Sequence, residues 1–185
     1  MKTPNVATLA ACIAACMFVT AVSAAPSCAD QKTALNNYLV AAFAHGNLTE
    51  AASYTTNDDS FELHWWSTTA GLEKIGFAPT YTGPQALFKF FGGVFSVVKD
   101  FHLAKSDAPP APLPGISDAG ELCGSATNGY DSVFVKEWQE ISTVIKNGNQ
   151  ITDARNLVRY VVNADNLIRE VNIFAETYKY EAAFA

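Results

Sequence analysis

The fold class is decided by the sequence LVRYVVNADNLIREVNIF, residues 157–174. Two runs rich in Val, Ile and Leu flank a polar turn at residues 163–166, which is the pattern of two antiparallel strands joined by a hairpin. The segment before it, DSVFVKEWQEISTVI at residues 131–145, reads as a further strand that turns back at residues 146–149. We therefore expect three long antiparallel strands in the second half of the chain.

Helical patterns occupy the first half. We expect helices at about residues 30–45, 49–54 and 84–95. Asp30 is the predicted cap of the first helix, Gly46 is typical of a helix stop, and Pro84 suits the first turn of the third. Helices that precede antiparallel strands indicate an α+β protein with the helices on one face of a curved sheet.

Two further segments complete this outline. DFHLAKS, residues 100–106, alternates like a strand. The residues from about 106 to 130 are rich in Pro, Gly and Ser, so we expect a long loop there.

Residues 1–25 have the pattern of an export signal. Lys2 is the only charged residue before Asp30, most of the segment is apolar, and small residues lead to a cleavage site near residue 24. The apolar core is too short and too rich in Ala to span a membrane. We expect residues 26–185 to be secreted or periplasmic and to form a single domain.

The four cysteines fall into two pairs. Cys12 and Cys16 lie in the export segment, within LAAC and IAAC, which resemble lipoprotein cleavage sites; the apolar run continues past both and argues against lipidation. Cys28 and Cys123 remain after cleavage in a compartment that oxidises thiols, so we expect a disulfide between them, worth roughly 4 kcal/mol in the chain-entropy model. Two unpaired buried thiols are the alternative.

Charge and motifs exclude several classes of function. The full chain carries a net charge of −6, and removal of Lys2 makes it one unit more negative, which repels phosphate backbones and anionic lipids. We expect no nucleic-acid partner. The three histidines lack the spacing of a metal site, and no Walker, dinucleotide or GxSxG motif occurs, so neither a metal nor a cofactor is predicted.

A family resemblance is carried by YLVAAFAHGNLTEAASYTTNDDSFELHWW, YTGPQALFKFF and LVRYVVNADNLIREVNIF. In hydrophobic spacing and turns these segments resemble the SnoaL-like polyketide cyclases and ketosteroid isomerase, members of the nuclear-transport-factor-like cone fold. The resemblance covers most of residues 26–185 and implies a curved antiparallel sheet, about three helices and a conical pocket for a small apolar or aromatic molecule. It also implies a homodimer through the sheet, as relatives often form.

The strand FELHWW, residues 61–66, holds the candidate catalytic residues. Because side chains alternate along a strand, it has a polar and an apolar face, made of Glu62, His64 and Trp66 against Phe61, Leu63 and Trp65. We expect the apolar set to pack under the helices and the polar set to face the pocket. His64 falls where, by the resemblance, ketosteroid isomerase-like proteins keep their base. We predict His64 as acid or base with Glu62 as its partner; a hydrogen-bonded rim histidine is the alternative.

Trp66, on the polar face of this strand, and four other residues are predicted to bind the ligand. Trp138 and Asn172 are expected to line the pocket, and Tyr81 to lie at its mouth. Tyr38 lies on the first helix, where the resemblance implies a tyrosine donor, although one position out of register. The sequence does not decide which face of the strand that holds Trp138 points inward. Two sets of side chains alternate there: Lys136, Trp138 and Glu140 on one face, and Glu137, Gln139 and Ile141 on the other.

The resemblance does not choose among chemistries. The donating acid of ketosteroid isomerase would fall near Leu157 and Val158, which are apolar, so a steroid isomerase is disfavoured. A cofactor-independent isomerase, cyclase or dehydratase is one hypothesis. A non-catalytic ligand-binding or dimeric interaction module of the same fold is the other, since the fold hosts both.

Overall fold

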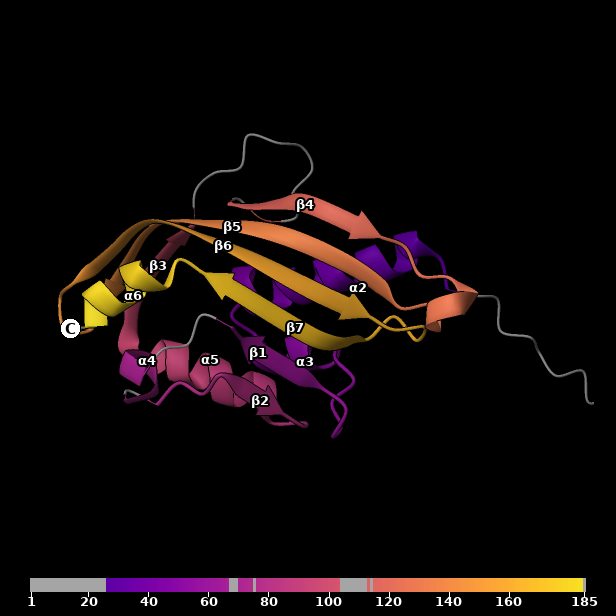
Figure 1. The fold of residues 1–185 in the computed structure, drawn as a ribbon, viewed down its shortest axis with the longest axis horizontal. Coiled ribbons are helices and arrows are strands. Elements are labelled where there is room, and N and C mark those ends of the chain that lie inside the picture. The colour runs from indigo at the N-terminus through magenta and orange to yellow at the C-terminus, as the bar shows by residue number, and fades with distance from the viewer. Residues whose placement is uncertain (1–25, 67–69, 75, 104–112, 114, 185) are drawn as a thin grey trace, which may run out of the picture.

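The computed structural model describes residues 26–66, 70–74, 76–103, 113 and 115–184, so the predicted export segment lies outside the described residues. Within them, seven strands form one curved, mixed sheet with helices packed against it (Figure 1). The strands are β1 Glu62–Trp65, β2 Thr80–Thr82, β3 Val98–Leu103, β4 Ile116–Leu122, β5 Ser132–Ile145, β6 Gln150–Val162 and β7 Ile168–Ala175.

The three long antiparallel strands predicted for the second half are confirmed as β5, β6 and β7. The sheet order is β2-β1-β7-β6-β5-β3, and β1 joins the edge of β7 in parallel, with His64 beside Asn172. Both β3 and β4 pair with β5, β4 along residues 133–138 and β3 along residues 140–145. β5 therefore pairs with three other strands, β3, β4 and β6.

The helices are α2 Cys28–Leu39, α3 Leu48–Ala52, α4 Ala70–Lys74, α5 Ala86–Val97 and α6 Thr177–Phe184. Ser27 caps α2 by accepting from the backbone N–H of Asp30, so Asp30 lies in the first turn and is not the cap. A π-helical turn, Val40–Ala44, extends α2 to the predicted stop, where Gly46 has φ 61°. In the part of the chain that the structure describes, no helix is long and apolar enough to cross a membrane.

The segment 106–130 is not a loop throughout, because it contains β4. Of the seven β4 residues only Ile116 is buried, so the sequence ISDAGEL has no buried face that would reveal it as a strand. The predicted disulfide is confirmed: Cys28 and Cys123 are bonded, with their Cα atoms 5.4 Å apart. It fastens the start of α2 to the chain just beyond β4. The short elements β2, α4 and α6 were not predicted.

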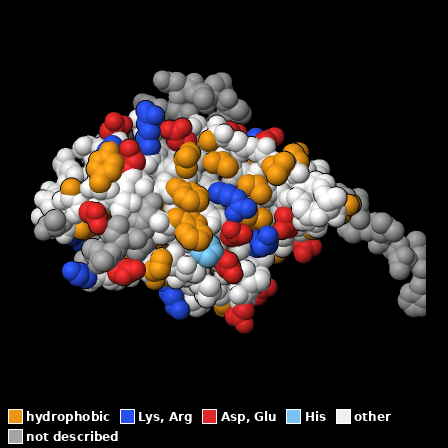
Figure 2. Space-filling model, viewed as in Figure 1, with side chains coloured by type: hydrophobic (Ala, Val, Ile, Leu, Met, Phe, Trp, Pro, Cys, Tyr) orange, Lys and Arg blue, Asp and Glu red, His pale blue; other side chains and the backbone are white. Residues whose placement is uncertain are grey.

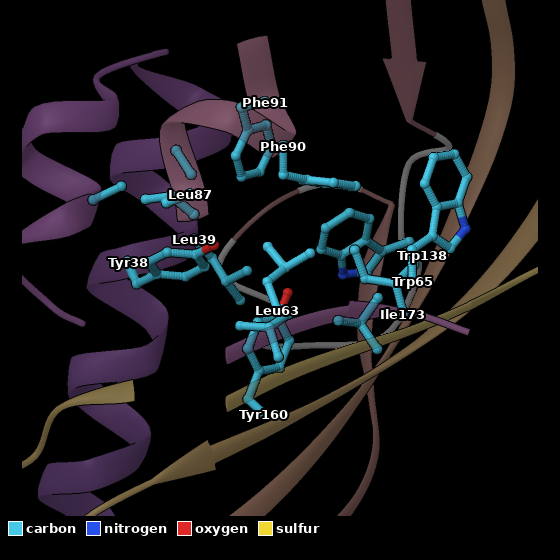
Figure 3. Close-up of a cluster of buried hydrophobic side chains, with 14 of the residues drawn as sticks. Tyr38, Leu39, Leu63, Trp65, Leu87, Phe90, Phe91, Trp138, Tyr160 and Ile173 are labelled. Carbon is cyan, nitrogen blue, oxygen red and sulfur yellow. The ribbon is translucent and has the colours of Figure 1, made fainter. Parts of the chain in front are cut away.

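The sheet face covered by helices carries the core. Leu63 and Trp65 of β1 and Phe61 just before it are buried in this core, as predicted for the apolar set. Figure 3 shows two ends of this cluster: Tyr38 and Tyr160 lie together at one end, and Trp65 and Trp138 at the other. The first end is filled by side chains, while the second borders a cavity.

Candidate functional site

A largely apolar cavity lies where α5 and α6 cover β1, β5, β6 and β7. Its empty space is about 790 Å³, a volume that includes open solvent at the mouth. Aromatic rings dominate its wall, among them Phe43, Trp65, Phe90, Phe91 and Trp138. The wall is therefore suited to a flat apolar molecule.

The two indoles of the wall are held by edge-on ring contacts. The ring centroid of Trp138 lies 4.7 Å from that of Phe43, and the centroid of Trp65 lies 4.9 Å from Phe77 and 5.8 Å from Phe90. Both indole N–H groups are buried and find no acceptor among the described residues. A buried donor without an acceptor costs free energy, so each of these groups has hydrogen-bonding capacity left for a ligand.

One polar cluster interrupts the apolar wall. Glu140 of β5 is only 5% exposed, and its Oε1 accepts from Asn156 Nδ2 at 3.0 Å and lies 2.5 Å from the Tyr180 hydroxyl. Its Oε2 accepts from the Thr143 hydroxyl at 3.0 Å. The same Tyr180 hydroxyl lies 3.0 Å from Asn156 Oδ1. All four residues line the cavity, so it has one polar end.

Burial changes the acidity of this cluster. Removal from water disfavours a carboxylate, so burial raises the pKa of Glu140, and hydrogen bonds from Tyr180, Thr143 and Asn156 offset only part of that rise. Burial also raises the pKa of Tyr180 well above its usual range, and the neighbouring Glu140 charge adds to the effect. A carboxyl with a raised pKa inside a cavity is typical of groups that exchange protons with ligands.

Trp138 lines the cavity, but the polar set of β1 does not. The apolar set enters the helix-covered face, and Trp65 from that set lines the cavity, so Glu62, His64 and Trp66 must point to the opposite face. The polar set was expected to face the pocket, and this placement was wrong. The cavity lies on the sheet face that the helices cover, so the side chains that pack under the helices are also the ones that line the cavity. The catalytic role of His64 and Glu62 stays a prediction that placement alone does not test.

On the outer face, His64 is part of a hydrogen-bonded row. Its Nε2 lies 3.0 Å from Glu62 Oε2 and its Nδ1 lies 3.1 Å from the Thr80 hydroxyl. Its ring stacks on Trp66 with centroids 5.1 Å apart, and the Trp66 indole donates to Asn172 Oδ1 at 2.7 Å. The predicted His64–Glu62 pair thus exists, on a surface rather than in the cavity.

This outer face also exposes large apolar side chains. Trp66, Leu157 and Phe174 are 61%, 47% and 47% exposed. Figure 2 shows hydrophobic side chains gathered at the centre of the face, with basic and acidic groups and a histidine beside them. Arg159 and Glu170 form an ion pair within it at 2.8 Å. We call this surface, defined by Trp66, Leu157, Phe174 and Arg159, the outer apolar patch.

The other predicted ligand-binding residues do not line the cavity. Tyr38 is buried at the filled end of the core, edge-on to Tyr160 with ring centroids 6.0 Å apart. Tyr81 is buried rather than at a mouth, and its hydroxyl accepts from the backbone N–H of Ala78 at 2.9 Å. Asn172 faces outward and also donates to Glu170 at 2.7 Å. Their roles in ligand binding have no support from position.

The polar end of the cavity was missed in the sequence. Glu140 lies two residues after Trp138, on the same strand face. Alternation alone therefore places Glu140 beside a residue that the sequence predicts to line the pocket. Asn156 lies directly opposite Trp138 in the β5–β6 register. Tyr180 comes from α6, a helix that the sequence pattern did not reveal.

Among the described residues, Cys28, Glu121 and Cys123 form the one group with three candidate metal-ligand atoms, which lie within 4.8 Å of one another. The two sulfurs are bonded to each other and have no thiolate to offer a metal ion. This group therefore carries no metal-site argument.

Comparison with known proteins identifies the fold. No family model matches the sequence, and no curated protein is significantly similar to it. In structure, the chain is similar to an NTF2-like protein of unknown function from Burkholderia pseudomallei, with a TM-score of 0.55 and 11% identity over 84% of this chain and 98% of the other. It is also similar to a ketosteroid isomerase-like protein from Erwinia carotovora atroseptica, with a TM-score of 0.56 and 16% identity over 80% and 95% of the two chains.

A third similar structure is that of TerC, co-crystallised with polyporic acid, with a TM-score of 0.53 and 13% identity over 84% of this chain and 98% of that one. Identities this low carry information on fold and not on activity. The chain therefore has the α+β cone fold of the NTF2-like and ketosteroid isomerase-like proteins, as the sequence resemblance implied.

Proposed function

We propose that this protein binds a small, largely aromatic molecule in the cavity between α5, α6 and the sheet. One observation carries the proposal: an aromatic wall with two unpartnered indole N–H groups ends in a single polar cluster around Glu140. Such a combination of apolar walls and a few fixed polar groups is typical of ligand sites. TerC, which has the same fold, was crystallised with polyporic acid, which supports a small-molecule role.

A second candidate function is cofactor-independent acid–base catalysis in the same cavity, such as an isomerisation, cyclisation or dehydration. The raised pKa of Glu140 favours it, because a buried carboxyl that holds its proton more tightly than usual is suited to general acid or base work. Here Glu140 takes the role first predicted for His64. Similarity to a ketosteroid isomerase-like structure agrees with this chemistry at the level of fold.

The binding proposal is tested with 2-acetylnaphthalene, a flat neutral probe with one acceptor oxygen. We expect it to raise the melting temperature of the wild type and of Trp66→Ala, and to have little effect on that of Trp138→Ala. The reason is that, of these two tryptophans, Trp138 lines the cavity and Trp66 does not. Trp66 is the matched control, an indole of the same sheet on the opposite face. Equal stabilisation of both variants would contradict the proposed site.

The catalytic proposal uses the same probe. Its methyl protons are acidic because they neighbour a carbonyl, so their exchange with D₂O, followed by proton NMR, reports acid–base chemistry without knowledge of the natural substrate. We expect exchange above the buffer rate, loss of it in Glu140→Gln and retention in His64→Ala. Loss in His64→Ala and retention in Glu140→Gln would instead assign the chemistry to the outer His64–Glu62 pair.

Two further parts of the proposal concern the setting of the protein. We propose that it is exported through residues 1–25, which the Cys28–Cys123 disulfide supports because such bonds persist in oxidising compartments. We also propose a homodimer through the outer apolar patch. Light scattering of the wild type and of Phe174→Glu tests the dimer, which is contradicted if the wild type is a monomer at micromolar concentration.

A further inference from the structure

We infer that the cavity selects an aromatic or apolar amine, whose protonated nitrogen pairs with Glu140 as a carboxylate. This ligand class rests on the proposed function, because it belongs to the same cavity. It is derived from a count of the hydrogens and lone pairs around Glu140, Asn156, Thr143 and Tyr180.

The Tyr180 hydroxyl has one hydrogen but faces two oxygens. It lies 2.5 Å from Glu140 Oε1 and 3.0 Å from Asn156 Oδ1. If Glu140 were a carboxylate, Tyr180 would donate to it and would turn a lone pair toward Asn156 Oδ1, which is repulsive. If Glu140 carries a proton, it donates to Tyr180, Tyr180 donates to Asn156, and Asn156 Nδ2 donates back to Glu140 at 3.0 Å.

The resulting ring satisfies every member, so the geometry indicates a neutral Glu140 in the structure described. Its burial in apolar surroundings agrees, since burial raises the pKa of this carboxyl. Thr143 uses its hydroxyl hydrogen on Glu140 Oε2 at 3.0 Å. The hydroxyl hydrogens of the cluster are therefore all directed at other cluster members, and its spare capacity consists of one Asn156 Nδ2 hydrogen and of lone pairs on Glu140 Oε2 and Asn156 Oδ1.

A polar end of this kind favours a ligand that donates hydrogen bonds. An ammonium group has three donors, no acceptor and a positive charge. Beside it, Glu140 is stable as a carboxylate, Tyr180 turns its single hydrogen to Glu140, and the ligand nitrogen supplies the donor that Asn156 Oδ1 then lacks. The aromatic rings of the wall suit the positive charge as well, because cations are attracted to ring faces.

The proton balance is fixed by this exchange. An amine that is already protonated in solution enters as a cation, and Glu140 releases its proton to the solvent, so one proton leaves per molecule bound. A carboxylate ligand has no cationic partner, because Glu140 is the one acidic side chain among the described lining residues, which include no Lys, Arg or His. Tyr180 is the other titratable lining group, and the nearby Glu176 of the same helix region is paired with Lys179 at 2.9 Å.

Three probes of nearly equal shape test the inference: 2-naphthylmethylamine, 2-naphthalenemethanol and 2-naphthoic acid. We expect the amine to bind the wild type about tenfold or more tighter than the alcohol, as a charge-assisted hydrogen bond would provide. The acid should bind weakest. Isothermal titration calorimetry in buffers of different ionisation enthalpy should show net proton release when the amine binds and none for the alcohol.

Glu140→Gln provides the matched variant. It keeps the size and polarity of the side chain but removes the charge, so we expect the preference for the amine over the alcohol and the proton release both to disappear. Circular dichroism of the variant checks that it folds. If the variant does not fold, the number of protons that the wild type releases on binding the amine tests the inference without it.

The outcomes separate the two proposals. If the alcohol binds as tightly as the amine, or no proton is released, the amine inference is overturned while the binding cavity stands. If the acid binds best, the charge assignment of the cavity is wrong. If none of the three probes binds the wild type, the proposed cavity function fails, and the amine inference fails with it.

Discussion

Trp65 and Trp66 are neighbours in sequence but belong to two different environments. Trp65 enters the helix-covered face, where it is 5% exposed among Phe77, Phe90 and Tyr180, whereas Trp66 on the opposite face is 61% exposed and stacks on His64. A single peptide bond thus separates the cavity wall from the outer apolar patch. The same contrast holds for the two polar clusters of the sheet, Glu140 inside and His64 outside.

Hydrogen bonding does not distinguish these two clusters, but burial does. His64 has a partner on each ring nitrogen, yet its side chain is 16% exposed and that of its partner Glu62 is 51% exposed. Glu140 has three partners and almost no contact with water. Since water screens charge, a change of protonation has larger consequences around Glu140. The interior cluster is therefore the stronger basis for chemistry.

The largest expected effect comes from the pair of indoles. Trp65→Ala removes a buried ring in contact with three other rings, so we expect the free energy of unfolding to fall by about 3–5 kcal/mol. Trp66→Ala should cost about 0.5–1 kcal/mol, because its ring is largely solvated. Urea denaturation followed by circular dichroism measures both. Similar losses in the two variants would mean that the faces of β1 are not as described.

A smaller effect is expected from a pair of tyrosines on α6. Tyr180→Phe removes the hydroxyl that links Glu140 and Asn156 and leaves buried polar atoms without a partner, so we expect a loss of about 1–3 kcal/mol in the free energy of unfolding. Tyr178→Phe should stay within about 0.5 kcal/mol, because Tyr178 is exposed. The same denaturation experiment applies, and a Tyr180→Phe variant as stable as Tyr178→Phe would remove the hydroxyl from the network.

Strand periodicity predicted much of the fold, but among the residues it selected for the site only Trp138 lines the cavity. The alternation of FELHWW and the long strands β5, β6 and β7 could be recognised because one face of each is buried. Strand β4 could not, since an exposed edge strand has no apolar alternation. Alternation also sorts side chains into two sets without saying which set lies toward the cavity; that depends on which face the helices cover, a tertiary property.

The site prediction from the resemblance differs from the structure in a specific way. By the resemblance, His64 falls at the position of a base that faces the pocket, with Glu62 beside it, but most of this cavity wall is apolar. Its polar end gathers Glu140, Asn156 and Tyr180 from two strands and a helix, across 16 and 40 residues of sequence. Such a cluster becomes visible only with the register of β5 and β6 and the position of α6.

The smallest expected effect is the pH dependence of stability, and it separates the interior carboxyl from the outer one. The pKa of Glu140 is raised above its ordinary 4.5, so the folded state binds this proton more tightly than the unfolded state. Its contribution is therefore fully present below about pH 4.5 and is lost as the pH rises through the folded-state pKa, by about 1.4 kcal/mol for each unit of the rise. We expect Glu140→Gln to flatten this decline in the free energy of unfolding as the pH rises above about 4.5. Glu62→Gln, a change to an exposed carboxyl on the outer face, should keep the wild-type slope. Parallel curves for the wild type and Glu140→Gln would show that Glu140 is not the interior group that holds the proton.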